Sequence, residues 1–247
     1  MKKILKFLGI FLFWVGIWQI LAFIAGKEVL LPSPVVTFAT LARLIVTSDF
    51  WLYCGASVLR ILTGLAFGTI FGSLLAVLTC KSKFCEELFS PLLSIIRATP
   101  VASFIILALV WIGRGNVPAF TSFLMVLPVI WNSVCVGIGS IDPSLSEMVR
   151  IFRLPFFKRV SYLYISSVLP SFSAGLRTGL GLAWKAGIAA EVISSPKFGI
   201  GAALYDSKVY LNTAELFAWT ATVVIISMVF EHLLDTLMKR LSASFNR

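Results

Sequence analysis

Long apolar stretches dominate this sequence, and short segments rich in Lys and Arg separate them. A helix needs about 20 apolar residues to cross a hydrocarbon layer about 30 Å thick. Six stretches meet this length, and we predict spanning helices at residues 4–25, 58–79, 89–112, 117–139, 168–193 and 216–238. None of them alternates like a barrel strand, and unpaired backbone groups are costly in lipid. The expected fold is an all-α polytopic membrane protein with about six transmembrane helices.

Composition and charge support a membrane protein and predict its orientation. Hydrophobic residues make up 59% of the chain and charged residues 13%, too few charges for a water-soluble domain. With the N-terminus inside, the inner segments hold twelve Lys and Arg residues and the outer segments hold five. Because basic residues favour the cytoplasmic side, both termini are expected in the cytoplasm. The net charge of +10 then reflects topology and anionic lipid, and no nucleic-acid partner is expected.

The N-terminal 55 residues are predicted to form a first transmembrane helix followed by a helix on the outer surface. The N-terminal Lys residues resemble those of a secretory signal, but the apolar run is about 18 residues long and lacks a small-residue cleavage site. We therefore expect it to be retained. Ser33 and Pro34 are typical of an N-cap and first helical position, so an amphipathic helix is predicted over residues 34–47.

Two further patterns concern helix packing and helix breaks. Gly64, Gly68 and Gly72 recur every four residues, a spacing that allows helix backbones to approach closely in lipid. Close packing is the first interpretation of this ridge, and a hinge or pore-lining face is the alternative.

Pro100 lies in the third predicted span, directly after Arg97-Ala98-Thr99, and it removes a backbone hydrogen bond. A kink or a broken helix is expected there.

The long connection between the fourth and fifth spans predicts a cytoplasmic helix-turn-helix elbow over residues 142–166. A short helix is expected to begin either with Asp142 as N-cap or with a capping box from Ser144 to Glu147. Pro155 is expected to interrupt it, and a basic amphipathic segment follows.

This elbow resembles the cytoplasmic loop of ABC importer permeases, which follows the pattern E-A-A-x3-G-x9-I-x-L-P. Glu147-Met148-Val149 stands for E-A-A, Arg153 for the glycine and residues 163–166 for I-x-L-P. Pro155 would supply the turn in place of that glycine, and Ser166, in place of the proline, should let the second elbow helix run smoothly into the fifth span. Further matches to permeases for sulfonates, taurine, nitrate and pyrimidine precursors follow in order, namely Leu31-Pro32-Ser33-Pro34, Ser57-Val58-Leu59-Arg60, the L-P-x3-A-G-L-R run of residues 169–177, Ala189-Ala190-Glu191 and Phe198-Gly199-Ile200-Gly201.

The resemblance implies a type I permease domain over residues 56–240 and a set of partners. A cytoplasmic ABC ATPase dimer, a second permease copy, most simply an identical one, and an extracytoplasmic solute-binding protein are expected, in a bacterial inner membrane. Glu147, Met148, Val149, Arg153 and Pro155 are the expected ATPase-coupling residues. Glu147 has an alternative role in the capping box. The cargo implied is a small, anionic solute or a pyrimidine precursor.

Ionisable residues at membrane depth are costly and usually face a cavity or a partner. Arg97 and Lys185 are predicted to line the translocation pathway, with helix-helix ion pairs or carbonyl contacts as the alternative. Glu191 is a third pathway candidate that could offset Lys185, although their separation of six residues puts them on different faces of the helix. Arg60 and Arg177 lie near span ends, where snorkelling to the interface is expected.

No catalytic or metal-binding residue is predicted in this chain. There is no G-x-x-x-x-G-K-[ST] phosphate loop, so ATP and Mg²⁺ are expected on the partner ATPase. The single histidine, His232, lacks the companion ligands of a metal site. An intramembrane serine protease would need a G-x-S-G turn, which is absent. A secondary transporter or channel acting alone is the alternative function, although no internal repeat is evident.

Overall fold

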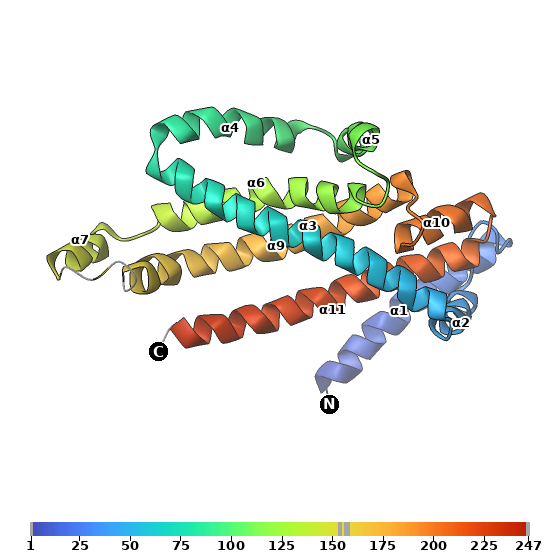
Figure 1. The fold of residues 1–247 in the computed structure, drawn as a ribbon. Helices are drawn as coiled ribbons and strands as arrows, with labels where there is room; N and C mark the ends of the chain where they lie inside the picture. The colour runs from blue at the N-terminus through green and yellow to red at the C-terminus, as the bar shows by residue number, and fades with distance from the viewer. Residues whose placement is uncertain (1, 153–154, 156–158, 246–247) are drawn as a thin grey trace.

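The computed structural model describes residues 2–152, 155 and 159–245, and within them every regular element is a helix (Figure 1). The elements are α1 (Lys2–Ala25), α2 (Pro34–Ile45), α3 (Ser48–Lys81), α4 (Lys83–Ala98), α5 (Val101–Trp111), α6 (Val117–Gly139), α7 (Pro143–Ile151), the π-helix η1 (Val160–Ile165), α9 (Ser166–Ser194), α10 (Ile200–Val209) and α11 (Thr213–Phe245).

The centre of the molecule is a three-helix layer in which α6 packs against both α3 and α9. Gly64, Gly68 and Gly72 all lie on the face of α3 that meets α6. A Cβ atom at Gly64 would lie 2.3 Å from the carbonyl oxygen of Ala119, and one at Gly68 would lie 2.7 Å from the Cβ of Val126. The glycine ridge therefore serves close helix packing, as first interpreted, because no larger residue fits between these backbones.

Helices form at all six predicted spans, and the third is broken. Three helices, α3, α6 and α11, are each long and apolar enough to cross a membrane. The predicted span 89–112 is instead divided into α4 and α5, which meet at an angle of 106°. The amide of Thr99 closes the last turn of α4 on the carbonyl of Ile95, and Pro100 has no amide with which to continue it. The predicted break at Pro100 is therefore confirmed.

The helix after the first span begins as the sequence indicates. The hydroxyl of Ser33 accepts a hydrogen bond from the amide of Val36, and Pro34 occupies the first turn. The opposite faces of α2 differ: Thr37 and Leu41 are buried, whereas Val35 is exposed. The main packing partner of α2 is α11, so α2 holds the N-terminal part of the chain against the C-terminal helix. The predicted boundary at residue 55 falls inside the continuous helix α3.

The elbow lies at one end of the molecule, opposite α2 and α10 (Figure 1). In the figure α7 projects beyond the ends of the neighbouring helices, and the C-terminal end of α11 points toward the same side. The π-helix η1 passes directly into α9 at Ser166, whose φ of −61° and ψ of −41° are helical. The smooth run into the fifth span is therefore confirmed. The predicted turn at Arg153 lies outside the described residues.

We predict that Gly68→Ala destabilises the protein, because its new Cβ would overlap Val126, and overpacking costs about 1–3 kcal/mol. Gly55→Ala is the matched control in the same helix, since a Cβ there meets nothing within 4 Å. Alanine should leave that site unchanged or slightly more stable. The measurement is the midpoint of thermal unfolding in detergent, and equal midpoints for the two variants would refute close packing at Gly68.

Candidate functional site

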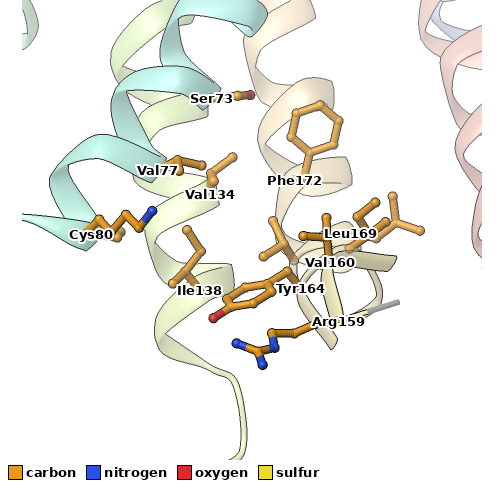
Figure 2. A pocket seen from close by; sticks show the side chains of 13 residues that line it. Ser73, Val77, Cys80, Val134, Ile138, Arg159, Val160, Tyr164, Leu169 and Phe172 are labelled. Atoms are coloured by element: carbon orange, nitrogen blue, oxygen red, sulfur yellow. The ribbon is translucent and has the colours of Figure 1, made fainter. Parts of the chain in front are cut away.

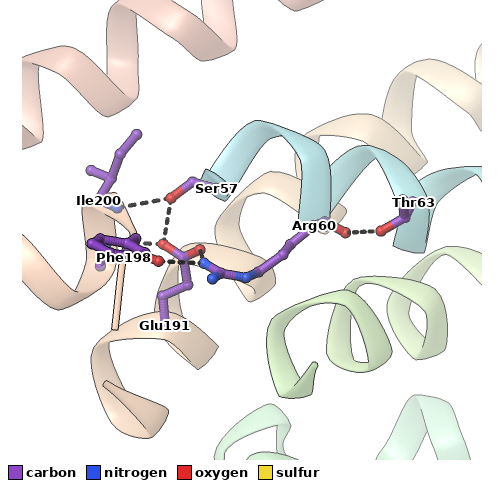
Figure 3. Close-up of polar contacts among 7 residues, drawn as sticks. Ser57, Arg60, Thr63, Glu191, Phe198 and Ile200 are labelled. Carbon is purple, nitrogen blue, oxygen red and sulfur yellow. Dashed lines mark hydrogen bonds and ion pairs between the residues drawn. The ribbon is translucent and has the colours of Figure 1, made fainter. Parts of the chain in front are cut away.

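A buried carboxylate, Glu191 on α9, lies at the centre of a polar cluster (Figure 3). Its side chain has 0% exposure. Arg60 Nη1 of α3 lies 3.0 Å from Glu191 Oε1 and forms an ion pair with it. The hydroxyl of Ser57 donates to Glu191 Oε2 over 2.6 Å, and the amide of Gly201 donates to the same oxygen over 3.0 Å. Both carboxylate oxygens are therefore engaged.

The same cluster holds the start of α10. The amide of Ile200 donates to Ser57 Oγ over 2.8 Å, and Arg60 Nη1 donates to the carbonyl of Phe198 over 2.6 Å. A carboxylate at a helix N-terminus is favourable because the first amides of a helix lack partners within it. Gly201 must be small, since a Cβ there would lie 2.3 Å from the Cβ of Glu191. The cluster thus joins α3, α9 and α10.

The geometry of this cluster bears on two predictions. Glu191 was a candidate for the translocation pathway; its side chain is enclosed by protein and pairs with Arg60, not with Lys185, and its part in transport stays a prediction. Arg60 was expected to snorkel to the interface, but it is tied to two groups inside the fold. A charge removed from water is stable only with a partner, and the sequence could not show that this partner lies 131 positions away.

Arg97 lines a cavity of about 320 Å³ between α4, α6 and α9. The other lining residues are Pro128, Val129, Asn132, Ser133, Ala174, Gly175 and Thr178. Hydroxyl and amide groups therefore share this cavity with a guanidinium. The Arg97 guanidinium carbon lies 5.3 Å from the centre of the Trp131 ring, a cation–π distance that holds the side chain against α6. The structure places Arg97 at a polar cavity, and its part in transport stays a prediction.

Lys185 lies on α9 beyond the lining of that cavity, with its side chain exposed. It follows Thr178 by seven residues, which is two helical turns and about 10 Å along the same face of α9. Gly181 lies between them on this face, and a Cβ there would meet nothing within 4 Å. Lys185 and the Arg97 cavity therefore share one open side of α9.

The elbow begins with a cap at Asp142. Its Oδ1 accepts hydrogen bonds from Ser144 Oγ at 2.7 Å and from the Ser144 amide at 2.8 Å. These two bonds lower the pKa of the Asp142 carboxyl below its usual value of 3.8, so it is a charged cap at neutral pH. Of the two predicted starts, the one at Asp142 is observed. Glu147 is left exposed on α7.

The predicted ATPase-coupling residues divide into two groups. Met148 and Pro155 are exposed, like Glu147, but Val149 on α7 is buried, with 5% of its surface exposed. Val149 is therefore less accessible to a partner than Glu147 and Met148, and its part in ATPase coupling stays a prediction. Arg153 lies outside the described residues.

Sequence reasoning missed an apolar face on the elbow. Leu145, Ile151 and Phe152 are exposed beside Met148, and Phe152 is 71% exposed. Residues 145, 148 and 152 are spaced by three and four, so they share one side of α7, and Val149, four residues after Leu145, is the buried member of that side. This spacing was readable in the sequence. An exposed apolar stripe on a projecting helix is typical of a protein contact surface.

Metal chemistry finds no support in the part of the chain that the structure describes, where no group of three or more His, Cys, Asp and Glu residues is arranged to hold an ion. His232 is exposed on α11. The predicted location of ATP and Mg²⁺ on a partner stays an expectation.

We predict that Glu191→Gln destabilises the protein by about 3–5 kcal/mol, because it leaves the guanidinium of Arg60 without a counter-charge inside the fold. The control is Asp235→Asn, which breaks the more exposed ion pair between Arg177 Nη2 and Asp235 Oδ1 at 2.7 Å, whose side chains are 58% and 35% exposed. Exposed pairs contribute at most about 1 kcal/mol. Thermal unfolding in detergent measures both, and an equal loss in the two variants would contradict a structural role for the Glu191 cluster.

Curated relatives match most of the chain. It is 26% identical over 230 residues to a Bacillus subtilis protein named as an aliphatic sulfonates transport permease, SsuC, covering 92% of this chain and 81% of SsuC. It is 24% identical to the taurine transport system permease protein TauC of Escherichia coli, covering 79% and 71% of the two chains. It is 26% identical to the nitrate import permease protein NrtB of Synechococcus elongatus, covering 84% and 77%.

Solved structures agree on the fold. The methionine ABC transporter MetNI, in inward-facing conformations, superposes with a TM-score of 0.62 over 78% of this chain and 94% of that one, at 15% identity. An amino acid ABC transporter crystallised with histidines gives 0.60 over 78% and 92%, at 16% identity. The family model for the binding-protein-dependent transport system inner membrane component matches residues 68–247. The chain therefore belongs to this family, as a permease subunit of an ABC importer whose ATPase is a separate subunit.

Proposed function

We propose that two copies of this chain form the translocation pathway of an importer and that each elbow binds one subunit of a cytoplasmic ATPase dimer. The observation that carries this proposal is α7, a helix that projects from one end of the molecule with Leu145, Met148 and Phe152 exposed along one side (Figure 1). An exposed apolar face on a helix is suited to a groove in a partner protein. Glu147 adds a charged contact next to it.

The elbow is built to transmit movement. Val149 on α7 and Leu163 on η1 are both buried, and α7 contacts η1, so a displacement of α7 is passed to η1. The π-helix continues into α9 without a loop, and α9 packs along α6 over much of its length. A rigid connection of this kind converts closure of the nucleotide-bound ATPase into a tilt of the central helices.

The elbow end is the cytoplasmic end in this proposal, and both termini lie in the cytoplasm. Support comes from the twelve basic residues that the predicted inner segments hold against five outside. The C-terminal end of α11 points toward the same side as α7, which is consistent with that assignment (Figure 1). The opposite end, with α2 and α10, is then the face toward the solute-binding protein.

The solute is proposed to be a small anion such as a sulfonate or nitrate. The Arg97 cavity offers a guanidinium beside Asn132, Ser133 and Thr178, which together can replace the hydration of an anionic group. Lys185 adds a second positive charge farther along the same face of α9. The relatives SsuC, TauC and NrtB are named for sulfonates, taurine and nitrate, which supports this class of solute.

We predict that Met148→Asp lowers ATP-dependent uptake at least about tenfold and reduces co-purification of the ATPase, because an unpaired carboxylate is costly to bury in an apolar interface. Met148→Leu keeps the apolar contact and should retain both. Uptake into proteoliposomes and subunit stoichiometry are the readouts. Full activity of Met148→Asp with a normally assembled ATPase would show that α7 is not the contact.

We also predict that Arg97→Gln with Lys185→Gln lowers uptake of taurine, ethanesulfonate or nitrate about tenfold or more, because each lost charge-assisted hydrogen bond is worth about 1.5–3 kcal/mol. Arg97→Lys should retain part of the activity. Arg114→Gln, at an exposed position outside the cavity, is the control. ATPase assembly should be normal in all three. The wild type identifies which of these anions is transported. If the double variant takes up that anion at the same rate as the wild type, the proposal of a pathway for anions is refuted.

A further inference from the structure

A second and larger cavity lies between α3, α6, η1 and the start of α9 (Figure 2). Its volume is about 730 Å³, within the range of small-molecule sites. Apolar side chains form most of its wall, among them Val77, Val134, Ile138, Val160, Leu169 and Phe172. We refer to it as the η1 cavity. It shares no lining residue with the Arg97 cavity.

One end of the η1 cavity is basic. Lys81, the last residue of α3, and Arg159, the residue before η1, both line it. Figure 2 shows the Arg159 and Tyr164 side chains at the end of the cavity away from Phe172. Arg159 Nε is buried and has no hydrogen-bond partner among the described residues. A buried cationic donor without an acceptor is costly, so this end is suited to an anionic ligand.

The two ends together define the chemistry of the occupant. The apolar wall is suited to hydrocarbon, and the two lining cations are suited to a phosphate group. A small hydrophilic solute would leave the apolar wall unmatched. Because the cavity lies between helices that are surrounded by lipid, and its basic end is on the elbow side, the anionic group would lie at the level of the cytoplasmic headgroups.

We propose that the η1 cavity binds an anionic glycerophospholipid of the cytoplasmic leaflet, with its phosphate between Lys81 and Arg159 and one acyl chain along Val134, Val160 and Leu169. This inference rests on the proposed orientation of the elbow and is independent of the transported solute. The bound lipid connects the end of α3 to η1, the segment through which α7 reaches α9.

The test is lipid retention by the intact permease–ATPase complex, transferred from vesicles of phosphatidylcholine and phosphatidylglycerol in equal amounts and examined by native mass spectrometry. Wild type should retain one phosphatidylglycerol per permease chain in preference to phosphatidylcholine. Lys81→Gln with Arg159→Gln should lower that retention at least about tenfold. Lys83→Gln with Lys239→Gln is the matched control, since both lysines are exposed, lie outside the cavity and belong to the same predicted inner set.

A second variant separates the cavity from general surface attraction. Leu169→Trp fills the apolar part and leaves both cations in place, so it should also lose phosphatidylglycerol. Retention by Leu169→Trp would place the lipid elsewhere. Equal retention by Lys81→Gln with Arg159→Gln and its control, or no preference over phosphatidylcholine, would overturn headgroup recognition. A wild type that retains no phosphatidylglycerol would overturn the proposal.

Discussion

Helices in lipid gain little from burying apolar side chains against one another, because the lipid is equally apolar. Their association depends on close packing and on polar groups that find partners inside the protein. Here α3 meets α6 through a row of glycines, and α3 meets α9 and α10 through the Arg60–Glu191 cluster. The orientation of the central helices, and so the positions of both cavities and the elbow, depends on these two contacts.

Local signals in the sequence predicted much of the fold. The Ser33 cap, the break at Pro100 and the glycine ridge each depend on residues within one or two helical turns, and each is found in the structure. The family assignment agrees with the order of motifs along the chain. It gives no support to a transporter or channel acting alone, since the relatives are permease subunits of ABC importers.

The candidate site was less predictable because it depends on which residues meet in space. Glu191 looked like a pathway residue from its depth in a span, whereas its partners Arg60 and Ser57 come from a helix more than 130 positions earlier. Val149 was expected to couple to the ATPase from its place in the motif, and its burial depends on how α7 lies on η1. Arg97 and Lys185 are separated by 88 positions and approach one open side of α9 only through the fold.

The π-helix η1 sets the rotational phase between the elbow and the central helices. A π-helical turn holds more residues than an α-helical one, because each amide bonds five residues back instead of four. Each residue added to or removed from this segment turns everything after it by about 100° about the helix axis. These six residues therefore set the direction in which the side of α9 with Thr178 and Lys185 faces relative to the elbow. Inserting or deleting a single residue in η1 would turn that side away from its present direction and leave every contact within α9 intact.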